Sequence, residues 1–207
     1  ALPDKAAQFG RADKPAVQHL LGEVYLTLAG ASTSSPYFAL AATKLAAVAN
    51  NSRFALVPRY RDLWRIDNEA NSEVVFSIQF TADPLTTGTG NKLHLYWTPA
   101  YDLEPGMLRD IANDRPFRRW RQTKWLLALW DRTKDSRYED MHKVVWISNN
   151  PNNIPKDANG NPKFTVGDTA VYMPGLPTIP PEMRAATRYK LYGENEYTDA
   201  MFPVLNK

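Results

Sequence analysis

The 207-residue sequence contains no cysteine. Disulfide bonds, thiolate catalysis and cysteine-bound zinc are therefore excluded. The sequence also has no apolar run that approaches the ~18 residues a membrane-spanning helix needs. Charge of one sign is not dominant either, since the net charge of +3 at pH 7 is too small to indicate nucleic-acid binding by itself. Composition thus favours a folded globular chain.

Known catalytic and metal-binding patterns are also missing. His19, His94 and His142 lie far apart, and a structural role is the simplest interpretation of each. Residues 157–161 resemble the start of a calcium loop, but the glycine is misplaced and no glutamate follows at the required distance. The acidic residues are scattered, so no pair is predicted to converge as acid and base. We therefore predict no catalytic residues, no metal site, no cofactor and no enzymatic activity.

Aromatic residues and prolines are abundant. Six tryptophans, ten tyrosines and eight phenylalanines make up 12% of the chain, which also contains 16 prolines. Proline fixes the backbone and interrupts helices and strands. This composition indicates a helical scaffold that carries long, ordered loops.

The first fifty residues predict a helix pair. Asp13 is a candidate N-cap, Pro15 lies in the first turn, and apolar residues follow the helical period up to a stop at Gly30. Pro36 opens a second helix that ends near Asn50. Short antiparallel helices rich in small residues are typical of tetratricopeptide-like arrays. One pair cannot bury its own apolar face, so we expect it to pack on other sequence.

The rest of the chain predicts short elements joined by loops. Strands are predicted over residues 73–80 and 142–147, and extended segments over 93–97 and 164–172. Helices are predicted over residues 54–64 in part, over 105–111, and through 126–130 with Thr123 as the cap. Loops are predicted over 67–72, 81–91, 149–162 and 174–181. The predicted fold class is mainly α with irregular loops and a few short strands (α+β). A tetratricopeptide-like part (1–66) is followed by a loop-rich ligand-binding part (67–207).

Aromatic residues in the loop-rich part are the candidate binding site. Sugar rings present flat C–H faces that stack on aromatic rings, while their hydroxyls need side-chain donors and acceptors. The alternative is that these rings form the core of long loops. The residues that we predict to bind ligand are Tyr96, Trp97, Tyr101 and Trp120 for stacking, with Asp102 and Arg121 for hydrogen bonds.

The most distinctive short stretch of the sequence is rich in basic residues. Residues 115–124 contain five arginines and lysines interleaved with two aromatic rings. Such a stretch could bind nucleic acid, with aromatic rings stacking on bases and cations on phosphates. The simpler interpretation is a loop entering a helix, with arginines paired to Asp110, Asp114 and Asp131. We therefore predict no nucleic-acid partner.

Five segments, in order, resemble the SusD/RagB family of nutrient-binding surface lipoproteins. They are residues 10–30, residues 60–64 with 68–80, residues 135–138 with 145–146, residues 167–170 and residues 202–207. The resemblance spans nearly the whole chain. It implies a scaffold of tetratricopeptide-like helix pairs with a loop-rich insertion.

The resemblance also implies a function and partners. It implies non-catalytic binding of a nutrient, most often a glycan, at the bacterial outer surface. The ligand would pass to a SusC-like TonB-dependent transporter. We expect the chain to be an internal piece of a longer protein, whose lipid anchor to the outer membrane lies outside it. A peptide or other nutrient as ligand, and a protein-interaction scaffold without a small ligand, remain open alternatives.

Overall fold

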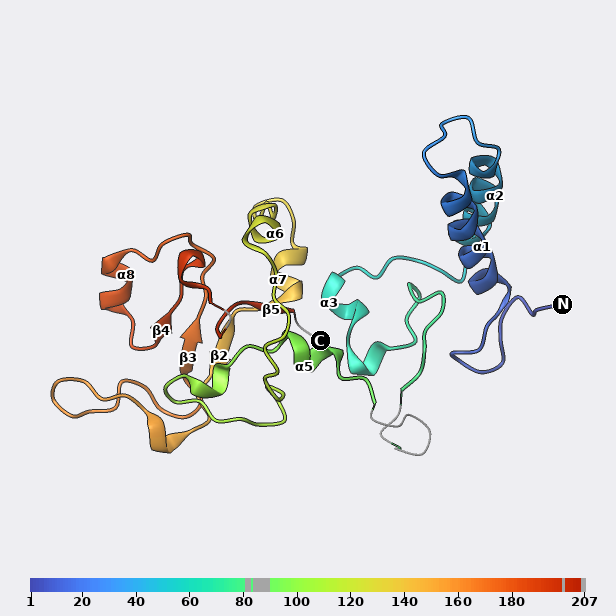
Figure 1. The fold of residues 1–207 in the computed structure, drawn as a ribbon. Helices are drawn as coiled ribbons and strands as arrows, with labels where there is room; N and C mark the ends of the chain where they lie inside the picture. The colour runs from blue at the N-terminus through green and yellow to red at the C-terminus, as the bar shows by residue number, and fades with distance from the viewer. Residues whose placement is uncertain (81–82, 84–89, 199, 206–207) are drawn as a thin grey trace. The chain divides into compact units, whose positions relative to one another are not determined.

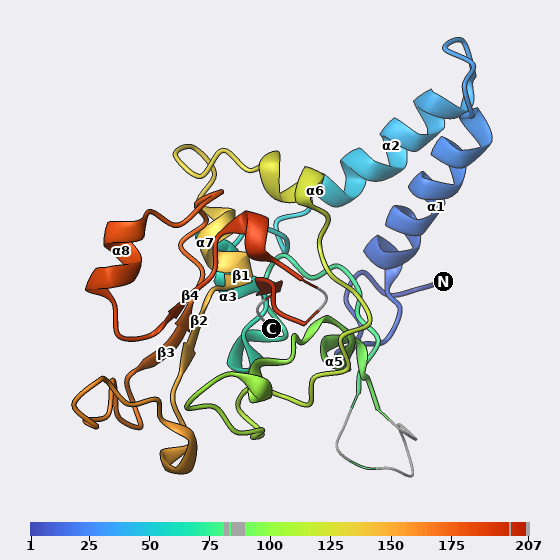
Figure 2. The ribbon, with the colours of Figure 1, turned by 60° about the vertical axis from the view of Figure 1, so that its left-hand side comes forward.

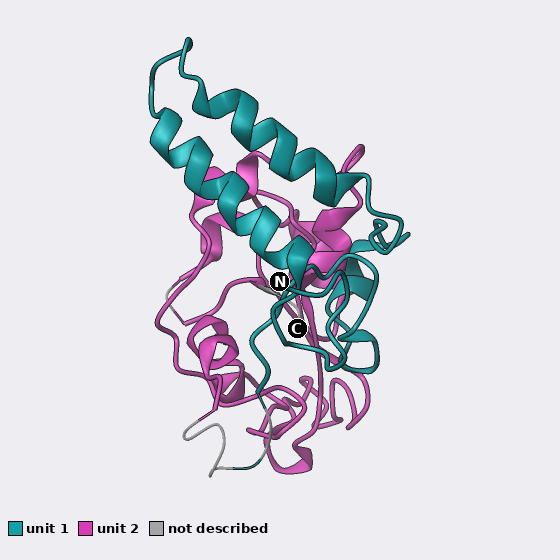
Figure 3. Cartoon of the chain, turned by 90° about the vertical axis from the view of Figure 1, so that its right-hand side faces the viewer, with its two compact units in different colours: residues 1–88 teal, residues 89–207 magenta. Residues whose placement is uncertain are grey.

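The computed structural model describes residues 1–80, 83, 90–198 and 200–205 (Figure 1). The chain forms two compact units, Ala1–Gly88 and Thr89–Lys207, which Figure 3 colours separately. The predicted fold class is confirmed, because helices dominate and the strands are few and short. The structural division falls after residue 88, whereas the sequence places a functional division after residue 66.

Two antiparallel helices dominate unit 1, as predicted. α1 (Lys14–Ala29) and α2 (Tyr37–Ala49) lie side by side in Figures 1 and 2. The Asp13 side chain accepts a hydrogen bond from the Ala16 amide at 3.1 Å and also pairs with Arg53 at 2.9 Å. Gly30 ends α1 with a φ of +58°. The carboxylate of Asp13 thus starts the helix and ties it to the chain that follows α2.

Side chains of the polar loop hold the rest of unit 1 together. This region contains α3 (Tyr60–Leu63) and the 3₁₀ turn η1 (Ile66–Asn68). The Asn71 amide donates to the carbonyls of Leu63 and Asn68 at 3.1 and 2.8 Å, and its oxygen accepts from the Glu73 amide at 3.0 Å. The Glu73 carboxylate accepts from the Val57 amide at 3.0 Å. This part of the family-like motif therefore has a structural role.

The prediction of a strand over residues 73–80 is wrong. All strands in the described part of the chain lie in unit 2, so this segment has no ladder partner. Its outward apolar side chains stay exposed, with Ile78 at 76%. Alternating apolar residues make a strand only when a neighbouring strand satisfies the backbone. The loop predicted at 81–91 lies largely outside the described residues.

Short elements make up unit 2, which contains the candidate site. Its helices and 3₁₀ turns are α5 (Leu93–Trp97), η2 (Tyr101–Leu103), α6 (Lys124–Ala128), α7 (Arg137–Met141), η3 (Pro151–Asn153), α8 (Pro181–Ala186) and η4 (Glu194–Glu196). Its strands are β1 (His142–Lys143), β2 (Val145–Ile147), β3 (Thr169–Tyr172), β4 (Lys190–Leu191) and β5 (Val204–Leu205). The predicted strand at 142–147 is confirmed as β1 and β2, and Thr123 caps α6 as predicted.

Two small sheets order these strands. β2 pairs with β3 in antiparallel fashion, with Val145 opposite Tyr172, and β3 pairs with β4 in parallel. β1 pairs with β5, with Lys143 opposite Val204, which returns the C-terminal segment to the middle of unit 2. Both sheets flank one apolar core, whose largest buried side chains include Trp146, Tyr101, Met107 and Met173.

Two further local predictions are wrong. Residues 93–97 form α5 rather than an extended segment, because the Asn91 side chain accepts from the Leu93 amide at 3.0 Å and starts a helical turn. Periodicity cannot separate a helix from a strand over five apolar residues. Residues 105–111 are irregular rather than helical, since the Gly106 amide donates to the Asn153 carbonyl at 2.6 Å instead of entering a helix.

Gly106 gives a stability prediction with an internal control. Gly106 and Gly160 both have positive φ, +77° and +82°, but a Cβ at Gly106 would collide with the Phe164 ring and one at Gly160 would meet nothing within 4 Å. We expect Gly160→Ala to cost about 1 kcal/mol of unfolding free energy and Gly106→Ala about 2–4 kcal/mol, measured by urea denaturation. Equal losses would contradict the packing of Gly106 against Phe164.

Candidate functional site

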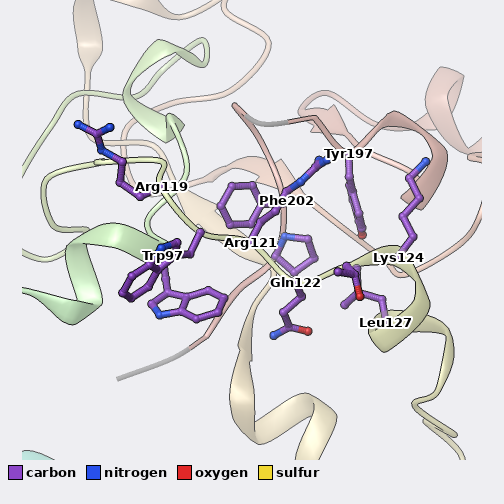
Figure 4. A pocket seen from close by; sticks show the side chains of 11 residues that line it. Trp97, Arg119, Arg121, Gln122, Lys124, Leu127, Tyr197 and Phe202 are labelled. Carbon is purple, nitrogen blue, oxygen red and sulfur yellow. The ribbon is translucent and has the colours of Figure 1, made fainter.

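An open pocket of about 720 Å³ lies within unit 2 (Figure 4). A volume between ~300 and 1,000 Å³ is typical of small-ligand sites. The described residues that line it come from α5, the segment before α6, α6 itself and the C-terminal segment: Trp97, Arg119, Trp120, Arg121, Gln122, Thr123, Lys124, Leu127, Tyr197, Phe202 and Pro203. It therefore combines an aromatic surface with a basic one.

Backbone hydrogen bonds create the first wall. The Phe117 amide donates to the Leu95 carbonyl at 3.0 Å, and the amides of Arg119 and Trp120 both donate to the Tyr96 carbonyl, at 2.9 and 3.0 Å. The last carbonyls of a helix have no partner inside it and need donors from elsewhere. Residues 117–120 supply these donors to α5 and thereby bring Trp120 next to Trp97.

Arg118 makes the double contact to Tyr96 possible. Its φ is +54°, in the left-handed region that side chains other than glycine rarely adopt. The turn at this residue lets the next two amides point at one carbonyl. Backbone strain of this kind persists only where surrounding contacts impose it, and it is often found beside functional sites.

The aromatic rings of this wall pack against one another. The centroids of Trp97 and Trp120 are 5.7 Å apart with the rings nearly perpendicular, and Tyr96 lies 5.0 Å from Trp120. Trp120 is nevertheless 45% exposed. Part of its ring surface is thus available to a ligand, while its orientation is fixed by two neighbours.

Long-range contacts position the opposite wall. Tyr197 and Phe202 lie in the C-terminal segment, where the Ala100 amide donates to the Ala200 carbonyl at 2.6 Å and β5 pairs with β1. Tyr197 is only 7% exposed, and its hydroxyl has no hydrogen-bond partner among the described residues. Burial raises the pKa of this phenol, so it stays protonated at neutral pH.

Arg132 fixes the turn that precedes Tyr197. Its guanidinium donates to the Gly175 carbonyl and to the Glu194 carboxylate, both at 2.8 Å, and lies 3.9 Å from the Tyr138 ring centroid. Glu194 begins η4, the turn immediately before Tyr197. One partly buried arginine therefore joins three segments behind the pocket.

Gln122 is oriented by a buried histidine. His142 Nδ1 donates to the Tyr138 carbonyl at 2.9 Å, since a carbonyl only accepts, and its neutral Nε2 then accepts from the Gln122 amide at 2.7 Å. Burial lowers the pKa of His142. The hydrogen bond to the Tyr138 carbonyl opposes this shift, and the charge of Arg132 acts in the same direction as burial. The neutral ring thus presents Gln122, a pocket residue, in one orientation.

The structure brings three of the six predicted site residues together. Trp97, Trp120 and Arg121 line the pocket. Tyr96 supports Trp120 from behind and does not line the pocket itself.

The other two predicted residues serve the fold. Tyr101 is fully buried at 0% exposure; its hydroxyl donates to the Asp114 carbonyl at 2.7 Å and accepts from the Asp110 amide at 3.2 Å. Asp102 accepts from Arg109 at 2.6 Å. No face of the Tyr101 ring is open to a sugar, so we correct the candidate site by leaving both residues out.

Sequence reasoning missed much of the polar lining. Arg119 and Lys124 belong to the basic stretch whose arginines we expected to pair with nearby aspartates. Asp131 instead pairs with Lys134 at 3.0 Å, and Asp110 accepts from Asn113 and Asn149 at 2.7 and 2.6 Å. The basic stretch was therefore the available signal for this side of the pocket. Tyr197 and Phe202 carry no local signal, because only long-range pairing brings them to the site.

Among the described residues, histidine, aspartate and glutamate side chains do not gather in groups of three that could hold a metal ion. No helix among those residues is long and apolar enough to cross a membrane.

Comparison with solved structures finds a structural likeness. The chain is similar to a solved SusD superfamily protein from Bacteroides fragilis, with 24% sequence identity and a TM-score of 0.47. The alignment covers 81% of this chain and 35% of that one, so this chain spans about a third of that protein. No protein-family model and no curated protein matches the chain.

Arg118 gives a test of how the first wall forms. Arg118→Asn and Arg118→Val remove the same charge, but asparagine tolerates positive φ whereas β-branched valine does not. We expect Arg118→Val to lower the unfolding free energy by about 1–2 kcal/mol relative to Arg118→Asn, measured by urea denaturation. Two variants of equal stability would show that the turn at Arg118 does not impose the backbone conformation described here.

His142 predicts a pH dependence. Because its folded pKa lies below the ordinary 6.5, the unfolded chain takes up a proton first as pH falls, and the neutral ring contributes stability only at higher pH. The unfolding free energy should therefore decrease below about pH 6.5, by at most about 1.4 kcal/mol per pH unit. His142→Gln should flatten this slope, and His19→Gln, which alters an exposed residue of α1, should preserve it. If the unfolding free energy of His142→Gln depends on pH as strongly as that of the unchanged chain, other titratable groups cause the dependence.

Proposed function

We propose that this chain binds an oligosaccharide or polysaccharide in the unit 2 pocket without catalysing its conversion. The observation that carries the proposal is the pairing of Trp97 and Trp120 at one wall of a pocket of about 720 Å³. Two indole rings held by packing present rigid apolar faces at little entropic cost. Such faces suit the C–H surfaces of sugar rings.

Polar groups around the rings support the same ligand class. Arg121 and Gln122 can donate several hydrogen bonds to sugar hydroxyls, and Gln122 is held in place by His142.

The resemblance of the five segments supports a cellular setting for this binding. We propose that the whole protein presents its ligand at the bacterial outer surface to a SusC-like TonB-dependent transporter of the outer membrane. In this setting the chain captures a nutrient, and the transporter takes it up. A passive role also agrees with the lack of a converging acid–base pair in the sequence.

A second candidate function, a protein-interaction scaffold, is favoured by unit 1. One stripe of α1 exposes four apolar side chains at helical spacing: Val17, Leu20, Val24 and Leu28. Exposed apolar stripes often mark contact surfaces. If protein contact were the sole function, no glycan would bind. The glycan-binding measurement described next therefore also discriminates between glycan binding and a scaffold role.

The proposed function predicts which tryptophans matter. Trp97→Ala and Trp120→Ala should each weaken glycan binding about fivefold to tenfold, because each removes a stacking face. Trp125→Ala is the matched control, since Trp125 lies on α6 at 72% exposure and does not line the pocket. Binding is measured by isothermal titration calorimetry, after a screen of neutral and acidic polysaccharides identifies a glycan that binds.

Circular dichroism of each variant verifies that the fold is retained. Glycan binding that survives both pocket substitutions in folded variants, or that falls equally in Trp125→Ala, would remove this pocket from the function.

A further inference from the structure

The charged side chains among the described residues that line the pocket are all cationic. Three cations line it, Arg119, Arg121 and Lys124, and none of the described lining residues is acidic. Within the described part of the chain, Arg119 and Lys124 form no ion pair. This local excess stands out in a chain whose net charge is only +3. A concentration of one charge in a concave surface attracts ligands of the opposite charge.

The cations are spread along the pocket rather than gathered at one point. Figure 4 shows Arg119 and Lys124 on opposite sides of the view, with Arg121, Tyr197 and Phe202 between them. A single small anion such as phosphate would need cations that converge on it. Cations that are distributed along an aromatic-lined pocket suit a chain with an acidic group on more than one of its units.

Aromatic rings lie between the cations. Tyr197 and Phe202 line the wall opposite Trp97 and Trp120 and leave an apolar surface between Arg119 and Lys124. Apolar ring faces flanked by separate cations suit a ligand that combines sugar rings with acidic groups.

From these observations we propose that the ligand of this pocket is an acidic glycan, an oligosaccharide whose units carry carboxylate or sulfate groups. Arg119 and Lys124 bind the acidic groups at the two sides, and Trp97 and Trp120 stack on the intervening sugar rings. This inference rests on the proposed function and narrows it to a substrate class.

An acidic glycan fits the pocket better than a nucleic acid does. Non-specific binding of single-stranded nucleic acid uses a positively charged groove that follows the backbone over several nucleotides. Here the further arginines of the basic stretch, Arg115 and Arg118, lie outside the pocket lining, so the cations do not form a continuous groove. Arg115 instead lies over the Phe117 ring, 5.4 Å from its centroid.

The test compares acidic and neutral ligands on the full chain and on charge-matched variants. The acidic probes are uronate oligosaccharides from polygalacturonate and alginate, and sulfated oligosaccharides from chondroitin sulfate and carrageenan. Their neutral counterparts are the carboxyl-reduced and desulfated forms of equal length, together with starch, xylan and mannan oligosaccharides. The double variant Arg119→Gln/Lys124→Gln removes two pocket charges. Lys156→Gln/Lys163→Gln removes two exposed charges outside the pocket lining.

We expect an acidic probe to bind about tenfold more tightly than its neutral counterpart, the effect of two partly screened ion pairs. The pocket double variant should lose this preference, and the control double variant should keep it. Raising the salt concentration should weaken acidic binding and leave neutral binding unchanged.

Each contrary outcome has a distinct meaning. If only neutral glycans bind, or if the pocket double variant keeps the acidic preference, this inference falls and the proposed function stands. If no glycan of either kind binds to the folded chain, both fall. If a single-stranded oligonucleotide binds and displaces the acidic glycan at lower concentration, the pocket is a nucleic-acid site and this inference is overturned. If only the sulfated probes bind, the acidic group of the ligand is a sulfate. If only the uronate probes bind, it is a carboxylate.

Discussion

The candidate site depends on how the short helix α5 ends. Five residues are too few for a helix to be stable alone, and its last carbonyls need external donors. The amides of residues 117–120 supply them, with Arg119 and Trp120 both bonded to Tyr96. This small set of backbone hydrogen bonds places Trp120 against Trp97 and sets the direction of the basic stretch that follows. Without these hydrogen bonds, no backbone contact would hold residues 117–120 against α5, and Trp97 and Trp120 would not be brought together.

Unit 2 achieves this with little regular structure. Its strands are two to four residues long, so the sheets alone bury little surface. Side chains that join distant segments supply the remaining order: Arg132 connects Gly175, Glu194 and Tyr138, and Ser148 donates to the Gly106 carbonyl at 2.8 Å. Because each such contact is buried or partly buried, each is worth more than a surface ion pair. The pocket is thus formed by the packing of loops, which explains why its walls come from three stretches that are far apart in the sequence.

The sequence predicted well what depends on local signals. Asp13, Pro15 and Gly30 delimit α1, Thr123 caps α6, and the β-branched residues Val145 and Ile147 lie in β2. It failed where the outcome depends on distant partners. Residues 73–80 have strand composition without a neighbouring strand, and Tyr101 has the composition of a binding residue but lies in the core. Of the site, Trp97, Trp120 and Arg121 could be chosen from the sequence, because aromatic and basic residues cluster there. Tyr197 and Phe202 could not, since they reach the pocket only through the return of β5 to β1.

The most direct measurement of the central claim, that the unit 2 pocket binds the glycan, is a two-dimensional NMR titration of the tryptophan indole N–H groups. The chain has six tryptophans, which provide site and control in one spectrum. On addition of a binding oligosaccharide, the indole resonances of Trp97 and Trp120 should shift in a saturable manner. Those of Trp64 in unit 1 and of exposed Trp125 should not move. Saturable shifts at Trp64 or Trp125, with Trp97 and Trp120 unchanged, would contradict the account.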